Sequence, residues 1–195
     1  MKGKRIIARL VLILLIAELL LVFLSWLLSA TLTDSVRPLL SSEGIRWFLG
    51  QFSVMLLKPQ LIWLILLSMA GGCLWRSGFF RPSQVSFRRR SALRVSFIVL
   101  VILIIIVALL VMMPQAVLLS STGLLWPSPF SRALVPILSA LAVITSMCYG
   151  LLSRTFTSLY DVYESFCIGL REMSPLLILY LFVVMFYESC LYVFF

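Results

Sequence analysis

The sequence predicts an all-α membrane protein, a polytopic helix bundle with five transmembrane helices and two amphipathic helices at the membrane interface. Of its 195 residues, 63% are hydrophobic and only 12% are charged, and the mean hydropathy is +1.16. A soluble domain carries about 25% charged residues, and a disordered chain has low hydrophobicity. We therefore expect a single transmembrane domain over residues 1–195.

Five apolar stretches are long enough to cross a bilayer, which takes about 20 residues in a helix. The first stretch is too long for the apolar region of a signal peptide, about 7–15 residues, so we interpret it as an uncleaved span. In the fourth stretch Pro136 is expected in the first turn of the helix, where its missing N–H is tolerated. The predicted spans are residues 10–30, 59–75, 95–113, 133–153 and 175–195.

Two further stretches, residues 43–57 and 158–173, have apolar residues at helical spacing and polar residues off that stripe. This pattern is typical of amphipathic helices that lie at a membrane interface. Ser41 or Ser42 is placed to cap the first of them. Ser158-x-x-Asp161 resembles a capping box at the start of the second.

The basic residues predict the orientation, because Lys and Arg collect in cytoplasmic loops. The formal net charge is +9, from 16 Lys and Arg against 7 Asp and Glu. With five crossings, 12 of the basic residues fall on the side of the N-terminus and 4 on the other. We therefore expect a cytoplasmic N-terminus and an outside C-terminus. Residues 76–94, which hold six arginines, are expected to form a cytoplasmic loop; a patch for anionic lipid or a partner is the alternative.

Several functions are excluded or disfavoured. The chain has no His, which removes His-based triads, His-ligated zinc and imidazole relays. No P-loop, H-E-x-x-H or G-x-S-x-G motif is present, so we expect no enzyme activity, no cofactor and no metal. We attribute the surplus of positive charge to topology and expect no nucleic-acid partner. The four cysteines are expected to be small buried hydrophobes.

Two carboxylates within the predicted spans are the candidates for chemistry, because an ionisable group in hydrocarbon is costly. Glu18 lies nine residues after Arg9, about 13 Å along a helix, and Glu188 lies in the outer half of the last span. They could couple transport to a proton or ion, or they could be protonated acids bonded between helices or to a partner. Neither has an evident cationic partner at membrane depth in the sequence.

Other positions are predicted to serve packing. Gly71 and Gly72, after Ala70, could allow close helix approach or mark an unwound segment. Trp47 and Trp126 are expected at the interfaces. The fourth span has a polar side that is expected to form hydrogen bonds between helices, made by Ser139, Thr145, Ser146 and Tyr149.

Two blocks of sequence resemble the p-aminobenzoyl-glutamate transporter (AbgT) family. One is Ser41-Ser42-Glu43-Gly44-Ile45-Arg46-Trp47, between the first two spans. The other runs from Arg94 to the last span, with short motifs in the family's order: Pro127-Ser128-Pro129-Phe130, Val135-Pro136, Tyr149-Gly150 and Asp161-Val162.

The resemblance implies an inner-membrane protein of bacterial type that carries out secondary transport of p-aminobenzoyl-glutamate or related solutes, and it leaves a homodimer open. Family members are much longer and carry two hairpin regions expected to hold sodium and substrate. Neither region has a counterpart here, so the resemblance implies a shortened member, and no family binding residue transfers to this chain. The alternative function is a non-transporting truncated bundle that acts as a scaffold or as a subunit of a membrane complex.

Overall fold

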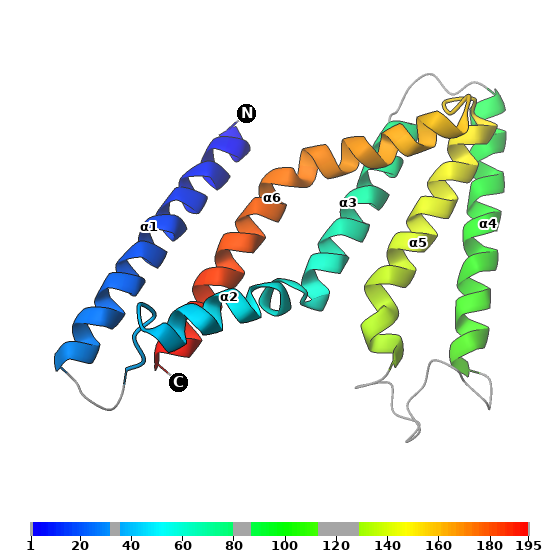
Figure 1. The fold of residues 1–195 in the computed structure, drawn as a ribbon. Helices are drawn as coiled ribbons and strands as arrows, with labels where there is room; N and C mark the ends of the chain where they lie inside the picture. Colours follow the sequence, from blue (N-terminus) through cyan, green and yellow to red (C-terminus); the bar gives the residue numbers. More distant parts are fainter. Residues whose placement is uncertain (1, 32–35, 80–86, 113–128, 195) are drawn as a thin grey trace. The chain divides into compact units, whose positions relative to one another are not determined.

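The computed structural model describes residues 2–31, 36–79, 87–112 and 129–194, and this part of the chain contains six α-helices and no strand (Figure 1). The all-α class is therefore confirmed. The helices are α1 (Lys2–Thr31), α2 (Ser42–Leu56), α3 (Pro59–Ser77), α4 (Phe87–Met112), α5 (Pro129–Leu152) and α6 (Leu159–Phe194).

Five of these helices are long and apolar enough to cross a membrane, as predicted. The exception is α2, which has 15 residues and matches the amphipathic helix expected over 43–57. Its N-terminus is capped by Ser41, whose hydroxyl accepts a hydrogen bond from the Gly44 N–H at 3.0 Å. Such a cap satisfies one of the free N–H groups in the first helical turn. The predicted cap is thereby confirmed at Ser41.

The described residues form two compact units, Met1–Ile62 with Met173–Phe195, and Trp63–Glu172. We call them the terminal unit and the central unit. The single domain expected over 1–195 stays a prediction.

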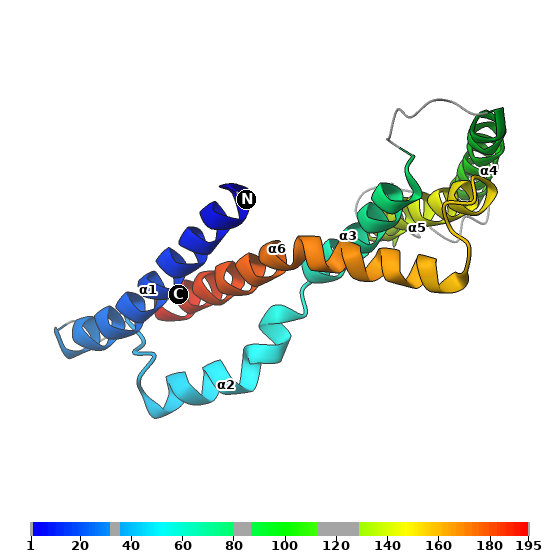
Figure 2. The same cartoon turned by 90° about the horizontal axis from the view of Figure 1, so that it is seen from above.

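In the terminal unit, α1 and the C-terminal part of α6 run parallel. Ser189 contacts Glu18 in the middle of α1, and the Arg37 N–H, six residues after α1 ends, donates to the Val193 carbonyl at 3.2 Å. The two helices thus advance together toward one end (Figures 1 and 2), where α2 crosses the C-terminal part of α6 in the view of Figure 1. Parallel spans of this kind have their starting ends on one side of a membrane.

In the central unit, α3 and the first half of α6 are in close contact through small residues. A Cβ placed on Gly72 would meet the Gly169 Cα at 2.5 Å and its nitrogen at 2.6 Å. Absence of a side chain therefore sets the separation of the two backbones. Nearby, Arg76 donates to Glu164 at 2.6 Å, and α4 packs alongside α5 (Figure 1).

Two helix boundaries differ from the prediction because proline is accommodated inside a helix. The expected segments 158–173 and 175–195 are one helix, α6, with Pro175 in its interior. Pro136 is also internal, since α5 begins at Pro129 and not near 133. Likewise, α3 continues through Gly71 and Gly72 to Ser77 without an unwound segment. Neighbouring helices allow proline and glycine within transmembrane helices.

Three of the four residues on the expected polar side of α5 form hydrogen bonds within their own helix and not between helices. Ser139, Thr145 and Ser146 each donate to a carbonyl three or four residues earlier in the same helix, at 2.7–2.9 Å. All three are buried. Hydroxyls within helices commonly satisfy themselves in this way, so the sequence pattern indicated burial and not a partner.

Candidate functional site

The candidate site is centred on Glu18, in the middle of α1. Its side chain is 7% exposed, although α1 is otherwise a long apolar helix of 30 residues. A carboxylate withdrawn from water at this depth requires a partner or a function. In the structure only one of the two Glu18 carboxylate oxygens has a hydrogen-bond partner among the described residues.

One carboxylate oxygen of Glu18 is bonded and the other is not. The Ser189 hydroxyl, on α6, donates to Oε1 at 2.6 Å, and Ser189 itself is 1% exposed. Oε2 is buried and has no hydrogen-bond partner among the described residues. Because buried polar atoms are nearly always satisfied, an unpaired buried oxygen marks Glu18 as a candidate for a functional role.

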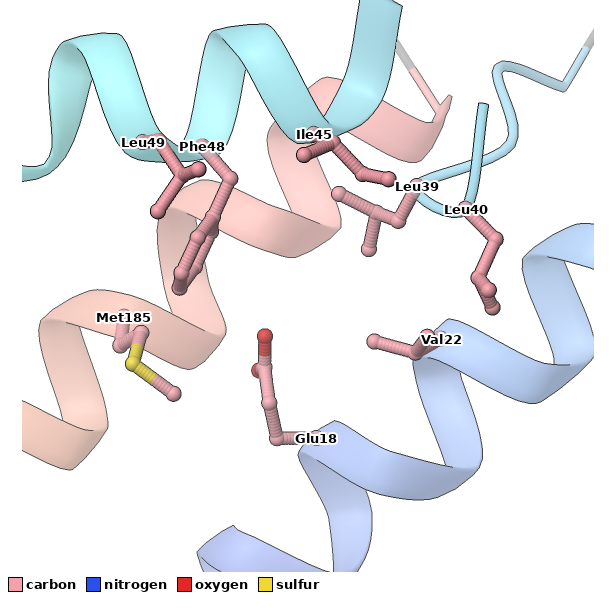
Figure 3. Close-up of a pocket in the computed structure, with 8 residues that line it drawn as sticks. All are labelled: Glu18, Val22, Leu39, Leu40, Ile45, Phe48, Leu49 and Met185. Carbon is pink, nitrogen blue, oxygen red and sulfur yellow. The ribbon is translucent and has the colours of Figure 1, made fainter. Parts of the chain in front are cut away.

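The Glu18 carboxylate points into a pocket of about 310 Å³ between α1, α2 and α6 (Figure 3). The other walls are apolar, and three of them belong to the amphipathic stripe of α2. The lining side chains are Glu18, Val22, Leu39, Leu40, Ile45, Phe48, Leu49 and Met185. The pocket thus combines a single polar group with an apolar chamber, as small-molecule sites commonly do.

The loop before α2 is held over this pocket by Ser25 of α1. The Leu39 N–H donates to the Ser25 hydroxyl oxygen at 3.3 Å, and that hydroxyl in turn donates to the Val22 carbonyl at 2.8 Å. Leu39 is therefore positioned by a bond to the same helix that carries Glu18. Helix α1 therefore holds both Leu39 of the pocket wall and the Glu18 carboxylate in place.

Glu188 has a cationic partner, contrary to the expectation from the sequence. Lys58, in the turn between α2 and α3, forms an ion pair with Glu188, and its ammonium group lies 5.6 Å from the centre of the Tyr187 ring. The Lys58 and Glu188 side chains are 36% and 19% exposed. The sequence did not indicate this pair because 130 positions separate the two residues.

Two consecutive residues of α6 therefore contact different elements. Ser189 reaches Glu18 on α1, and Glu188 reaches Lys58 beside α2. Successive side chains on a helix point about 100° apart, which permits this division. A single turn of α6 thus links the buried carboxylate to the more exposed ion pair.

The remaining predicted positions have different outcomes. Trp47 of α2 stacks on Tyr192 of α6, with ring centres 4.1 Å apart. Gly72 makes the close contact with Gly169 described above, whereas a Cβ on Gly71 would meet nothing within 4 Å. Gly71 thus lies on an open side of α3 within this chain, and its assignment to packing stays a prediction. Trp126 lies outside the described residues.

The described residues contain no group of three or more Asp, Glu, Cys or His side chains that could hold a metal ion. Cys73, Cys148, Cys167 and Cys190 are free thiols. Cys73 is buried as expected, while Cys167 is exposed. The chemistry available at the site is therefore that of a carboxyl group, a hydroxyl and an apolar chamber.

Ser189, Lys58 and most of the pocket wall were not predicted as site residues. A signal was present for Ser189, which directly follows Glu188. The α2 stripe was recognised as apolar, yet its period does not distinguish a surface facing lipid from one facing a carboxylate. Only the folded contacts distinguish these surfaces.

Residues 80–191 match the sequence profile of the AbgT transporter family. This segment includes Glu188 and Ser189, while Glu18 and Lys58 precede it. No curated protein and no solved structure matches the chain. Since the profile covers more than half of the sequence, and five helices are apolar enough to cross a bilayer, the chain is a multi-pass membrane protein that belongs to the AbgT transporter family.

Proposed function

We propose that this protein is a secondary transporter of p-aminobenzoyl-glutamate or related solutes and that Glu18 couples solute movement to a proton or cation. The supporting observation is the buried Glu18 carboxyl group at the wall of an apolar pocket, with one oxygen bonded to Ser189 and the other buried without a hydrogen-bond partner among the described residues. A carboxyl group that alternates between dry and wet surroundings binds and releases a proton, because burial disfavours its charged form.

The same proposal places the chain in a bacterial inner membrane, with the N-terminus in the cytoplasm and the C-terminus outside. The parallel course of α1 and the end of α6 supports opposite sides for the two termini. The excess of basic residues near the N-terminus supports its cytoplasmic side. We further propose a homodimer or a membrane-protein partner, because the most apolar stretches of α1 and α4 are each only 6% buried within the chain.

Solute flux into proteoliposomes tests this function. Purified protein should move p-aminobenzoyl-glutamate when a proton or sodium gradient is imposed, and Glu18→Gln should abolish coupled flux. Glu43→Gln is the matched control, because Glu43 is an exposed carboxylate at the start of α2. Absence of flux under every gradient, or undiminished flux in Glu18→Gln, would refute the proposal.

The alternative is a non-transporting scaffold or subunit, and the exposed apolar helices are the observation that favours it. Crosslinking in native membranes followed by purification distinguishes the two. A stoichiometric partner together with zero flux would support the scaffold. Recovery only as a free monomer would count against it.

A further inference from the structure

We propose that the central unit binds an anionic phospholipid, with the headgroup on the arginines at the start of α4 and an acyl chain in a groove between α4 and α5. This site does not include Glu18 and does not depend on the proposed transport function. The four arginines, Arg88, Arg89, Arg90 and Arg94, all lie in the first turns of α4.

The positive charge of these arginines is not balanced within the part of the chain that the structure describes. The first turn of α4 has no acidic residue, and none of the four arginines forms an ion pair with a described residue. The nearby Glu164 carboxylate already pairs with Arg76, and the Asp161 carboxylate accepts the Thr157 and Ser158 N–H groups.

The position of this charge on the helix is unfavourable without an anion. A helix N-terminus carries a partial positive charge, so cations near it are repelled. Arg90 and Arg94 are also four positions apart on one face, where like charges destabilise a helix. Both side chains are exposed. An anion bound among the arginines would reduce both repulsions.

The groove between α4 and α5 provides an apolar surface for an acyl chain. Helix α4 packs alongside α5, and the groove between them has a volume of about 360 Å³. Its lining side chains are all apolar: Ile104, Val107, Leu134, Ile137, Leu138 and Leu141. Ile104, Leu134 and Leu138 are exposed, so the groove is open to the surrounding lipid.

Arg89 and Arg90 lie on the same face of α4 as the groove residues. Val107 follows Arg89 by 18 residues, which is five helical turns, and Ile104 follows Arg90 by 14 residues, which is close to four turns. Ile104 is therefore about 21 Å along the helix from Arg90. Half of a bilayer, headgroups included, measures about 20–22 Å. A lipid with its phosphate at Arg90 would therefore end its chains at the groove.

Contacts and exposed aromatic side chains place these arginines at headgroup level. A Cβ on Gly78 would lie 3.5 Å from Arg89 Nη2, and the Phe79 ring lies 5.4 Å from the Tyr149 ring, edge to face. The ends of α3 and α5 therefore meet the start of α4 (Figure 1). Exposed aromatic rings at this end, typical of a membrane interface, are those of Trp75, Phe87 and Tyr160.

An acidic protein is the competing partner for the arginines. Such a partner would balance their charge, but it would not account for the exposed aromatic rings at the same end of the unit. It would also leave the groove, one half-bilayer away, without an occupant. A phospholipid accounts for the charge, the rings and the groove together.

The test measures which lipid the full chain retains. The protein is reconstituted with equal amounts of phosphatidylglycerol and phosphatidylcholine and extracted in mild detergent, and the bound lipids are counted by native mass spectrometry. Phosphatidylglycerol should be retained at least about tenfold over phosphatidylcholine, because each arginine near an anionic lipid contributes about fivefold in binding.

Variants locate the site. Arg89→Gln/Arg90→Gln should lower the ratio of the two lipids by about tenfold, since two of the four charges are removed. Arg46→Gln/Arg132→Gln should preserve the ratio, because it removes two exposed arginines, one on α2 and one near the start of α5. Ile104→Trp, which fills the groove, should reduce the retained phosphatidylglycerol several-fold.

Equal retention of the two lipids by the unmodified protein would overturn the inference, and this comparison does not depend on the folding of any variant. An unchanged ratio in Arg89→Gln/Arg90→Gln would also overturn it. Full retention in Ile104→Trp would refute the placement of the acyl chain in the groove. An acidic protein released by Arg89→Gln/Arg90→Gln, without any lipid preference, would assign the arginines to a protein partner instead.

Discussion

Gly72 of α3 and Gly169 of α6 meet backbone to backbone, so that a Cβ placed on either residue would collide with the other. From the side of Gly169, the added atom would lie 2.9 Å from the Gly72 Cα. Ser68 and Ser165 precede these glycines by four positions and are also buried. Both helices therefore present a stripe of small residues at this contact. Because lipid tails are as apolar as leucine, the hydrophobic effect does not drive helices together within a membrane, and close backbone packing stabilises the contact instead.

Gly72→Ala should destabilise the central unit, whereas Gly71→Ala should not. The added methyl group at position 72 meets backbone atoms that cannot rotate away, and overpacking of this kind costs about 1–3 kcal/mol. At position 71 the space is open, and alanine favours a helix over glycine by about 1 kcal/mol. Unfolding of both variants in mixed detergent micelles measures the difference. Equal stability of the two variants would contradict the observed crossing.

Ser189→Ala should lower stability by about 1–2 kcal/mol, because it removes the donor to a buried carboxylate. Ser146→Ala is the control, since the Ser146 hydroxyl donates to the Val143 carbonyl within its own helix, α5. We expect the control to cost distinctly less in the same unfolding assay. A larger loss in the control would show that the Ser189–Glu18 bond does not contribute as described.

Lys58 and Glu188 should show a coupling energy of about 1 kcal/mol in a double-mutant cycle, given their partial exposure. The cycle uses Lys58→Met, Glu188→Gln and the double variant, with unfolding free energy as the readout. Each single variant leaves one ionised group unpaired, and the double variant removes both. Strictly additive single effects would mean that the ion pair makes no net contribution.

Asp161→Ala should loosen the first turn of α6. The Asp161 carboxylate accepts hydrogen bonds from the Thr157 N–H at 2.7 Å and the Ser158 N–H at 3.0 Å, which matches one half of the predicted capping box. Hydrogen exchange of these amides should become several-fold faster in Asp161→Ala. The exchange rate in Asp161→Asn should lie between the rates of the unmodified protein and of Asp161→Ala. Unchanged exchange in the alanine variant would argue against the cap.

The sequence predicted correctly those features that depend on the surrounding lipid or membrane interface. Long apolar stretches identified the five spans, and the stripe of 43–57 identified α2, because lipid and interface impose simple patterns. The cap at Ser41 was also predictable, since it depends on residues four positions apart or fewer.

The sequence did not predict features that depend on contacts between helices distant in the chain. Hydropathy does not reveal which helices touch, so the pairing of Lys58 with Glu188 and the different roles of Gly71 and Gly72 were hidden. Continuity of α6 through Pro175 was missed for the same reason, because local preference disfavours proline inside a helix. Glu18 was recognised because burying an ionisable group in hydrocarbon is costly. Its pocket could not be predicted, because the lining residues come from separate segments of the chain.

Labelling with a hydrophobic carbodiimide tests whether Glu18 lies in a solute site, because the reagent modifies carboxyl groups within membranes and mass spectrometry identifies the modified residue. Glu18 should be modified in the intact protein, and p-aminobenzoyl-glutamate should protect it in a concentration-dependent manner. Modification of Glu18 that no concentration of the solute reduces would contradict the claim that this carboxylate lies in a solute site.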